Sequence, residues 1–118
     1  METAIAYENN LLINWVAVCE VDDIEEEDVV PFEYGGASYA VYHLESGFYA
    51  TAGICTHEVA KMADGFVMDD MVECPKHQGR FHIPTGQAKG GPVCANLKTY
   101  PTKVSEAVVY IGLTGDQA

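Results

Sequence analysis

Apolar and polar residues alternate in short runs along most of the chain, and turn residues separate the runs. Alternation with a period of two places alternate side chains on opposite faces of an extended strand. The runs are rich in β-branched and aromatic residues, and none has an amphipathic pattern of helical length. The pattern therefore predicts an all-β fold of antiparallel strands.

The predicted strands follow one another with short turns between them. The glycine pair Gly35-Gly36 predicts a hairpin turn, and Asp69-Asp70 predicts a second one. The last two runs are expected to pair with each other and close the chain. The predicted strands cover residues 15–18, 29–34, 38–44, 48–51, 63–68, 71–73, 80–83, 97–100 and 108–111, and the acidic run 22–28 is expected to be a solvated turn.

Two short segments combine sulfur and nitrogen ligands. Cys55-Thr56-His57 and Cys74-Pro75-Lys76-His77 each begin with a cysteine and end with a histidine, and sixteen residues separate them. Two thiolates and two imidazoles suit a tetrahedral zinc ion, or a [2Fe-2S] cluster in which one iron takes two Cys and the other two His. Structural zinc sites usually offer like ligands from each turn. One Cys and one His in each loop therefore favours the two-iron cluster.

The two segments also carry a family resemblance. C-T-H, followed after sixteen residues by C-P-K-H-Q-G, resembles the two cluster loops of Rieske iron-sulfur proteins. The resemblance implies that one [2Fe-2S] Rieske cluster is bound by four ligands: Cys55, His57, Cys74 and His77. The Gly90-Gly91-Pro92 segment is similar to the proline loop that covers the cluster in this family.

The resemblance covers most of the chain and implies its organisation. At 118 residues the chain is expected to form a single domain, in which a metal centre adds to a modest core. By the resemblance this is the Rieske fold, an antiparallel β-sandwich base that carries a small cluster-binding β subdomain. The base would comprise roughly residues 15–51 and 97–113, and the cluster-binding subdomain roughly residues 52–96.

The loops differ from those of high-potential Rieske proteins, which resemble C-T-H-L-G-C and C-P-C-H-G-S with a following Tyr. The positions of that family's extra Cys pair, which forms a disulfide between the loops, hold Ala60 and Lys76 here. The positions of its Ser and Tyr hydroxyl donors hold Gly79 and Phe81. Fewer hydrogen bonds to the cluster sulfurs imply a reduction potential near the low end of the Rieske range, about −150 mV rather than +300 mV.

A short chain with such loops resembles the Rieske-type ferredoxin of bacterial multicomponent aromatic-ring-hydroxylating dioxygenase systems. This implies a one-electron carrier, not an enzyme, between a flavin-containing NAD(P)H-dependent reductase and a terminal Rieske non-haem iron oxygenase in aromatic compound degradation. We expect it to act as a monomer. One alternative is a small Rieske subunit of another oxidoreductase such as nitrite reductase, and a second is a structural zinc module.

Composition limits the partners and the location. The net charge is −12, with ten of the eighteen acidic residues in positions 1–34, so nucleic acid is excluded as a partner. No run of eighteen apolar residues is present, and the N-terminal segment has no Lys or Arg, so we expect neither a membrane span nor a signal peptide, and a cytoplasmic protein. The basic residues Lys61, Lys76, Arg80 and Lys89 are either ordinary surface charges or a basic tip that orients the molecule.

The remaining candidate residues surround the loops or stand apart from them. His57 and His77 are expected at the tip, with a docking rim formed by Glu58, Val59, Lys76, Gln78 and Pro92. His43 and His82 are expected to be surface or packed strand residues and not ligands, and Cys19 and Cys94 to be buried or half-buried free thiols.

Overall fold

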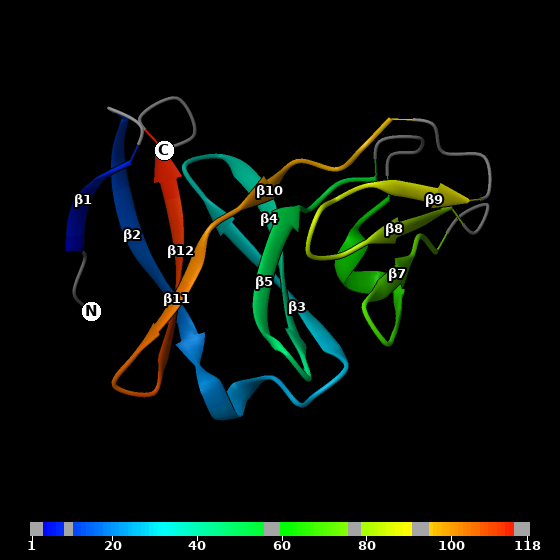
Figure 1. The fold of residues 1–118 in the computed structure, drawn as a ribbon, viewed down its shortest axis with the longest axis horizontal. Helices are drawn as coiled ribbons and strands as arrows, with labels where there is room; N and C mark the ends of the chain where they lie inside the picture. Colours follow the sequence, from blue (N-terminus) through cyan, green and yellow to red (C-terminus); the bar gives the residue numbers. More distant parts are fainter. Residues whose placement is uncertain (1–3, 9–10, 56–59, 76–78, 91–94, 115–118) are drawn as a thin grey trace.

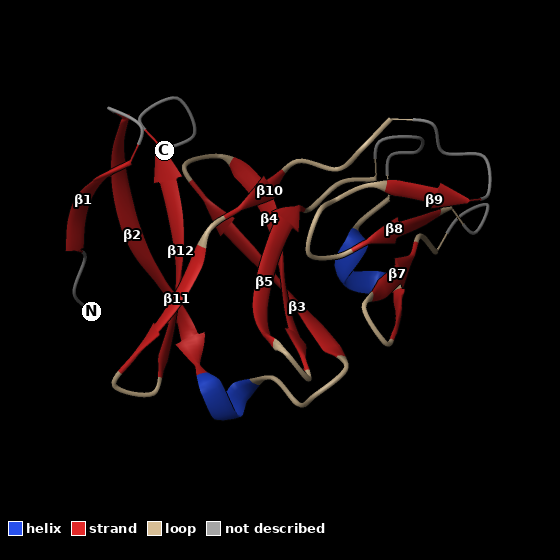
Figure 2. Cartoon of the chain, in the orientation of Figure 1, coloured by secondary structure: helices blue, strands red, loops and turns tan. Residues whose placement is uncertain are grey.

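The computed structural model describes residues 4–8, 11–55, 60–75, 79–90 and 95–114. In these segments the chain forms three four-stranded antiparallel sheets and two single 3-10 turns (Figures 1 and 2). The predicted all-β fold is therefore confirmed. Within the same segments no helix is long and apolar enough to cross a lipid bilayer.

The first sheet joins strands from both ends of the chain, in the order β1-β2-β12-β11. The predicted strand 15–18 lies inside a longer strand, and two strands of this sheet were not predicted. The two unpredicted strands are β1 and β11. The strands of this sheet are β1 (Ala4–Glu8), β2 (Leu11–Glu20), β11 (Thr102–Ser105) and β12 (Val108–Thr114). The acidic run after β2 is a solvated turn as predicted, with one 3-10 turn, η1 (Val21–Asp23), and only Ile24 buried between residues 22 and 28.

The second sheet has the order β10-β5-β4-β3 and follows the predicted hairpins. Gly35 and Gly36 adopt φ values of 61° and 83° in the turn between β3 and β4. A two-residue hairpin turn of this kind needs positive φ at both positions, which glycine adopts without strain. The strands are β3 (Asp28–Tyr34), β4 (Ala37–Leu44), β5 (Gly47–Ala52) and β10 (Thr99–Tyr100).

The predicted pairing of runs 97–100 and 108–111 is wrong. Thr99 and Tyr100 pair with β5 in the second sheet, whereas β12 pairs with β2 and β11 in the first. Pro101 separates β10 from β11, and a proline has no N–H to give to a ladder. Its carbonyl instead accepts the Gly112 N–H at 2.8 Å, at the point where the chain crosses from one sheet to the other.

The third sheet has the order β6-β7-β8-β9. The predicted strand 63–68 is shorter than expected because Met62–Asp64 forms the 3-10 turn η2. Asp69 adopts a φ of 56° in the turn that follows β6. The last strand was not predicted. The strands are β6 (Phe66–Met68), β7 (Met71–Glu73), β8 (Arg80–His82) and β9 (Ala88–Gly90).

Strand β4 contributes buried residues to two cores. Tyr39 and Val41 belong to a first core with residues of the first sheet, including Val16, Val109, Ile111 and Leu113. Ala40, Tyr42 and Leu44 belong to a second core with residues of the third sheet. Because successive side chains of a strand point to opposite faces, this one strand joins the two cores. The second core also contains Cys55, Met62, Val67, Val72, Cys74, Phe81, Ile83 and Leu97.

Candidate functional site

The first motif begins shortly after β5, with Gly53 and Ile54 between the strand and Cys55. Gly53 follows that strand, is buried, and donates its N–H to Ser38 O at 2.9 Å. A Cβ on Gly53 would lie 2.8 Å from the Ser38 carbonyl carbon, so the chain leaves β5 in close contact with β4. A bridge between Ile54 and Lys61 then fixes both sides of the first loop. Backbone contacts of Gly53 and Ile54 therefore fix where the chain enters Cys55.

The second motif begins directly after β7 and leads into β8. Glu73, the last residue of β7, pairs with Arg80, the first residue of β8, and their side chains approach to 3.8 Å between Oε1 and Nε. One position further into the sheet, Val72 pairs with Phe81, and both are fully buried. This hairpin fixes where the second loop starts and ends.

The two loops are closed by the same kind of hydrogen bond. The Cys55 N–H donates to Ala60 O at 2.9 Å, and the Cys74 N–H donates to Gly79 O at 2.7 Å. In each loop the cysteine is therefore bonded to the carbonyl five residues later. The similarity of the two closures was not predicted, because the two motifs differ in the spacing between Cys and His.

Both motif cysteines lie in the second core. Cys55 is 5% exposed and Cys74 is 1% exposed, and they share this core with Met62, Val72 and Phe81. The structure thus brings together two thiols that are nineteen positions apart in the sequence. A thiolate is costly to bury in an apolar core unless a cation or metal is bound to it. The donor set therefore fits a metal centre held by two thiolates.

The other predicted site residues are divided between the described and undescribed parts of the chain. His57, His77, Glu58, Val59, Lys76, Gln78 and Pro92 lie outside the described residues. Phe81, at the position of the family's Tyr donor, is fully buried and has no hydroxyl group to donate. Ala60 packs against the second core.

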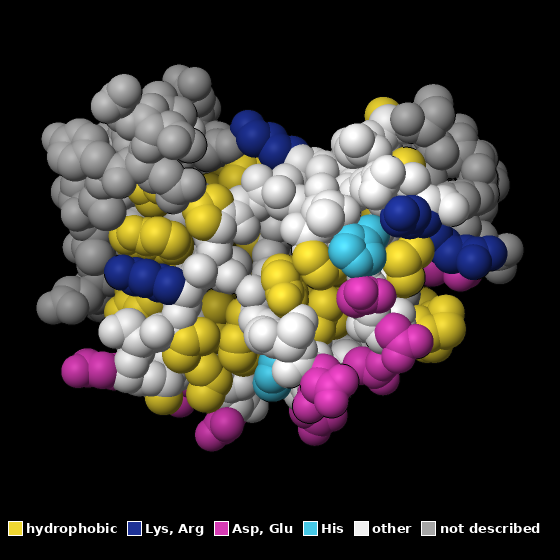
Figure 3. Space-filling model, in the orientation of Figure 1, with side chains coloured by type: hydrophobic (Ala, Val, Ile, Leu, Met, Phe, Trp, Pro, Cys, Tyr) yellow, Lys and Arg dark blue, Asp and Glu magenta, His cyan; other side chains and the backbone are white. Residues whose placement is uncertain are grey.

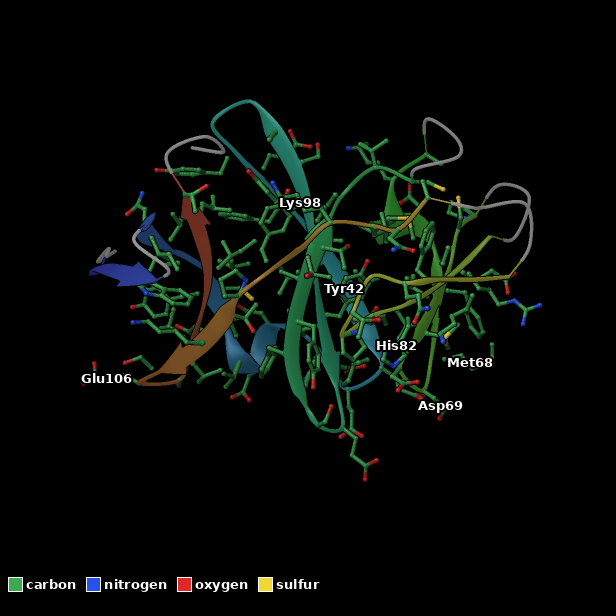
Figure 4. The ribbon with its side chains drawn as sticks, turned by 45° about the horizontal axis from the view of Figure 1, so that its top comes forward. Tyr42, Met68, Asp69, His82, Lys98 and Glu106 are labelled. Carbon is green, nitrogen blue, oxygen red and sulfur yellow. The ribbon has the colours of Figure 1, made fainter. Side chains whose placement is uncertain are left out.

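A buried hydroxyl pair supports the start of the first loop and was missed from the sequence. The Tyr42 hydroxyl lies 2.9 Å from Thr51 Oγ1, which in turn donates to Ala52 O at 2.9 Å. Thr51 has one hydroxyl proton, so Tyr42 is the donor to Thr51. Tyr42 lies near the centre of the molecule (Figure 4). Burial raises the pKa of Tyr42, and the hydrogen bond with Thr51 opposes this only in part.

The two described histidines are packed strand residues, as predicted. His43 Nδ1 donates to Ile24 O at 2.7 Å, and its ring stacks on Phe48 at 4.1 Å between centroids. His82 has Asp70 Oδ2 at 3.1 Å from Nε2 and Thr85 Oγ1 at 2.8 Å from Nδ1 (Figure 4). Each ring is occupied by local contacts.

The two remaining cysteines, Cys19 and Cys94, lie outside the two motifs. Cys19 is a half-buried free thiol, as predicted, and burial raises its pKa with a further contribution from Asp23. Cys94 lies outside the described residues.

Comparison with known families and sequences gives a consistent result. A family model described as the Rieske [2Fe-2S] domain matches residues 14–101. The ferredoxin component of the naphthalene 1,2-dioxygenase/salicylate 5-hydroxylase systems of Ralstonia sp. is 43% identical over 98 residues, which are 83% of this chain and 94% of the relative. The match therefore includes both motifs and nearly the whole relative.

Solved structures agree with the sequence matches. The complex of reduced oxygenase and oxidised ferredoxin in carbazole 1,9a-dioxygenase contains a chain with a TM-score of 0.80 and 32% identity, covering 88% of this chain and 95% of that one. A nitrite reductase small subunit from Mycobacterium tuberculosis has a TM-score of 0.75 at 22% identity, covering 86% of this chain and 96% of that one. At that identity the second match shows a shared fold alone.

The Tyr42 to Thr51 pair gives a pH-dependent prediction. A tyrosine whose pKa is raised by folding stabilises the protein below its ordinary pKa of 10.0 and loses that contribution as the pH rises above it. At pH 8 we expect the Tyr42→Phe variant to be less stable than the natural chain by about 1 kcal/mol, because one buried hydrogen bond is lost. Between pH 10 and 11 Tyr42 ionises in the unfolded natural chain but stays protonated in the folded one, which lowers the stability of the natural chain. The variant has no hydroxyl at this position and loses nothing, so the difference in stability between the two proteins should shrink.

Thermal unfolding of the two metal-loaded proteins, followed by circular dichroism, measures this gap at each pH. A difference of about 1 kcal/mol corresponds to about 4 °C in melting temperature for a domain of this size. Tyr39 and Tyr100 also have raised pKa values but are present in both proteins, so their contributions cancel. A gap that stays constant from pH 8 to pH 11 would contradict the role given to Tyr42.

Proposed function

This chain belongs to the Rieske [2Fe-2S] family, and we propose that it binds one [2Fe-2S] cluster through Cys55, His57, Cys74 and His77. The two cysteines supply thiolates from the second core, and each stands at the start of a loop closed by its own backbone N–H. Each loop carries its histidine two or three positions after the cysteine. Two thiolates and two imidazoles are the ligand set of a Rieske centre.

The proposed organisation follows from the same assignment. The cluster-binding subdomain comprises roughly residues 52–96, and the third sheet with both motifs falls within this range. The base comprises roughly residues 15–51 and 97–113, and most of the first and second sheets fall within these ranges. Strand β4 connects the two parts because its alternate residues face both cores.

The chain acts as a one-electron carrier and not as an enzyme. It takes electrons from a flavin-containing NAD(P)H-dependent reductase and delivers them to a terminal Rieske non-haem iron oxygenase in aromatic compound degradation, as a cytoplasmic monomer. The main support is the 43% identity to a dioxygenase-system ferredoxin component across 94% of that relative. The chain with 32% identity in the carbazole 1,9a-dioxygenase complex supports the oxygenase as acceptor.

The residues of this chain have distinct parts in that function. When bound, the cluster accepts and releases a single electron. The burial of Cys55 and Cys74 keeps water away from their thiolates. The two loop-closing hydrogen bonds limit how far the ligands can move between redox states. The Tyr42 to Thr51 pair holds the end of β5, from which the first loop begins. A carrier needs this rigidity because ligand movement would slow each transfer.

The ligand assignment predicts a specific spectroscopic change. Replacing an imidazole by a thiolate adds negative charge to the cluster and lowers its potential. The His77→Cys variant should therefore lose the Rieske electron-spin-resonance signal or show a different one, with a lower midpoint potential. The natural protein should contain iron and acid-labile sulfide in equal amounts. Zinc in the purified protein, or an unaltered signal in the variant, would refute the assignment.

The low potential has a separate test at Phe81. A Phe81→Tyr variant adds a hydroxyl donor at the family's tyrosine position, which should stabilise the reduced cluster and raise the potential by about 50 mV. The Phe66→Tyr variant is a matched control, because the same hydroxyl is added to a side chain that is 62% exposed on the third sheet. Protein-film voltammetry measures both potentials. Equal potentials in the natural and Phe81→Tyr proteins would contradict this account of tuning.

Reconstitution tests the function itself. A candidate reductase and oxygenase are mixed with NAD(P)H and an aromatic substrate, and the dihydroxylated product is measured with and without this chain. We expect product to depend on the chain, and the metal-loaded His77→Cys variant to support much less of it. Equal product without the chain would show that the electrons reach the oxygenase by another route and would contradict the proposal.

A further inference from the structure

The outer face of the third sheet carries three large apolar side chains, of which two are exposed and one is partly buried. Phe66 and Met68 stand two positions apart on β6, and Met71 pairs with Met68 across the β6–β7 hairpin. Phe66 is 62% exposed, Met68 is 46% exposed and Met71 is partly buried. We call Phe66, Met68 and Met71 the outer apolar patch. Because β6 is an edge strand of this sheet, no described strand lies beyond it.

The outer apolar patch is not needed for the core. The alternate residues of the same hairpin, Val67 and Val72, point inward and are buried with Phe81. Among the described residues four large hydrophobic side chains are exposed, and two of them are Phe66 and Met68 on this one short strand. Contiguous exposed apolar side chains with a polar border are typical of contact sites for other proteins.

Acidic residues border the outer apolar patch. Asp64 precedes β6, Asp69 and Asp70 form the hairpin turn, and Glu73 lies opposite Phe66. Two of these carboxylates have nitrogen neighbours on β8: Arg80 Nε lies 3.8 Å from Glu73 Oε1, and His82 Nε2 lies 3.1 Å from Asp70 Oδ2. We call these four carboxylates the acidic rim. Figure 3 shows hydrophobic surface beside acidic side chains at this end of the molecule, and Figure 4 shows Met68 and Asp69 at its margin.

The acidic surface extends beyond the acidic rim toward the second sheet. A cavity of about 320 Å³ lies beside the hairpin turn and is lined mainly by carboxylates, which are Glu26, Glu27, Glu45, Asp69 and Asp70. The Asp69 N–H donates to Glu27 Oε2 at 2.9 Å, so the turn is anchored to the second sheet's side of this surface. A partner with lysine or arginine side chains would complement such a surface.

The β6–β7 hairpin connects the two ligand loops. Lys61 follows the closing residue of the first loop and leads through η2 into β6, and β7 ends immediately before Cys74. A protein docked on the outer apolar patch would therefore sit on the segment that carries both loops. Three side chains and their border make a small contact, which matches the size of transient electron-transfer interfaces, below about 1,200 Å² in total.

We propose that the outer apolar patch and the acidic rim dock the terminal oxygenase, through an apolar recess bordered by lysine or arginine side chains. This rests on the function proposed above, in which the oxygenase is the electron acceptor. A second copy of this chain is a poor occupant, because it would bring the same acidic rim against this one and because a stable dimer buries about 800 Å² on each partner. The reductase is the other candidate, and the experiment separates the two.

The test compares the metal-loaded natural protein with a Phe66→Ser, Met68→Ser double variant. Each is reduced chemically and mixed with oxidised oxygenase in a stopped-flow instrument, and the rate of its reoxidation is followed against oxygenase concentration. We expect the concentration for half-maximal rate to rise about tenfold, as for removal of apolar anchors at an interface. The saturating rate should stay unchanged because the ligand loops are intact. Reduction by the reductase should keep its concentration dependence.

A matched control and a charge variant complete the test. Val104→Ser alters a side chain that is 49% exposed on β11, in the first sheet, and should leave the oxygenase dependence unchanged. Asp69→Asn removes one charge of the acidic rim and retains a residue that tolerates positive φ. It should slow association with the oxygenase at low salt and make the rate less sensitive to salt.

The outcomes decide between this proposal and the alternatives. An unchanged oxygenase dependence in both the double variant and Asp69→Asn would overturn the docking surface while leaving the carrier function intact. An equal or larger loss with the reductase would overturn the assignment to the oxygenase. A natural protein that sediments as a dimer, and a double variant that sediments as a monomer, would show that a second copy occupies the patch. A natural protein that carries its cluster but transfers no electron to the oxygenase would overturn both proposals.

Discussion

The two hydrogen bonds from Cys55 N to Ala60 O and from Cys74 N to Gly79 O are the constraint on which the site depends. Each fixes a cysteine at the start of a loop whose two sides belong to paired backbone. The bonds differ in what lies behind them, since the first loop rests on the end of β5 and the second is the turn of a hairpin. Two different structural elements therefore place Cys55 and Cys74 in the second core through the same type of backbone hydrogen bond.

The second core explains how a chain of 118 residues can combine stability with a metal site. The core holds the two cysteines together with fully buried Tyr42, Val72 and Phe81. Polar groups near it have partners: Tyr42 donates to Thr51, and Thr51 donates to Ala52. In a domain of this size a bound metal adds useful stability to a modest apolar core. The cofactor that we propose therefore has a structural part as well as a redox one.

The sequence predicted the elements that local patterns encode. Strands β3, β4 and β5 are short runs rich in β-branched and aromatic residues, and Gly35-Gly36 marks their first hairpin. It did not predict β9, which is only three residues long. It also gave the run 97–100 the wrong partner, because β10 pairs with β5, far away in the chain. The cysteines of the site are visible in a motif, but the Tyr42 to Thr51 bond is not. That bond depends on the register of β4 on β5, which only the folded structure gives.

The distribution of charge near the loops differs from a simple basic tip. Lys61 lies 3.9 Å from Glu33, and Arg80 lies 3.8 Å from Glu73, so two of the four basic residues assigned to the tip have carboxylate neighbours. The Lys61–Glu33 pair is exposed and the Arg80–Glu73 pair is partly exposed, and each contributes at most about 1 kcal/mol to stability. Their main effect is to cancel positive charge beside the ligand loops. At the β6–β7 hairpin, the exposed carboxylates of Asp64, Asp69 and Asp70 favour a partner with a basic contact surface.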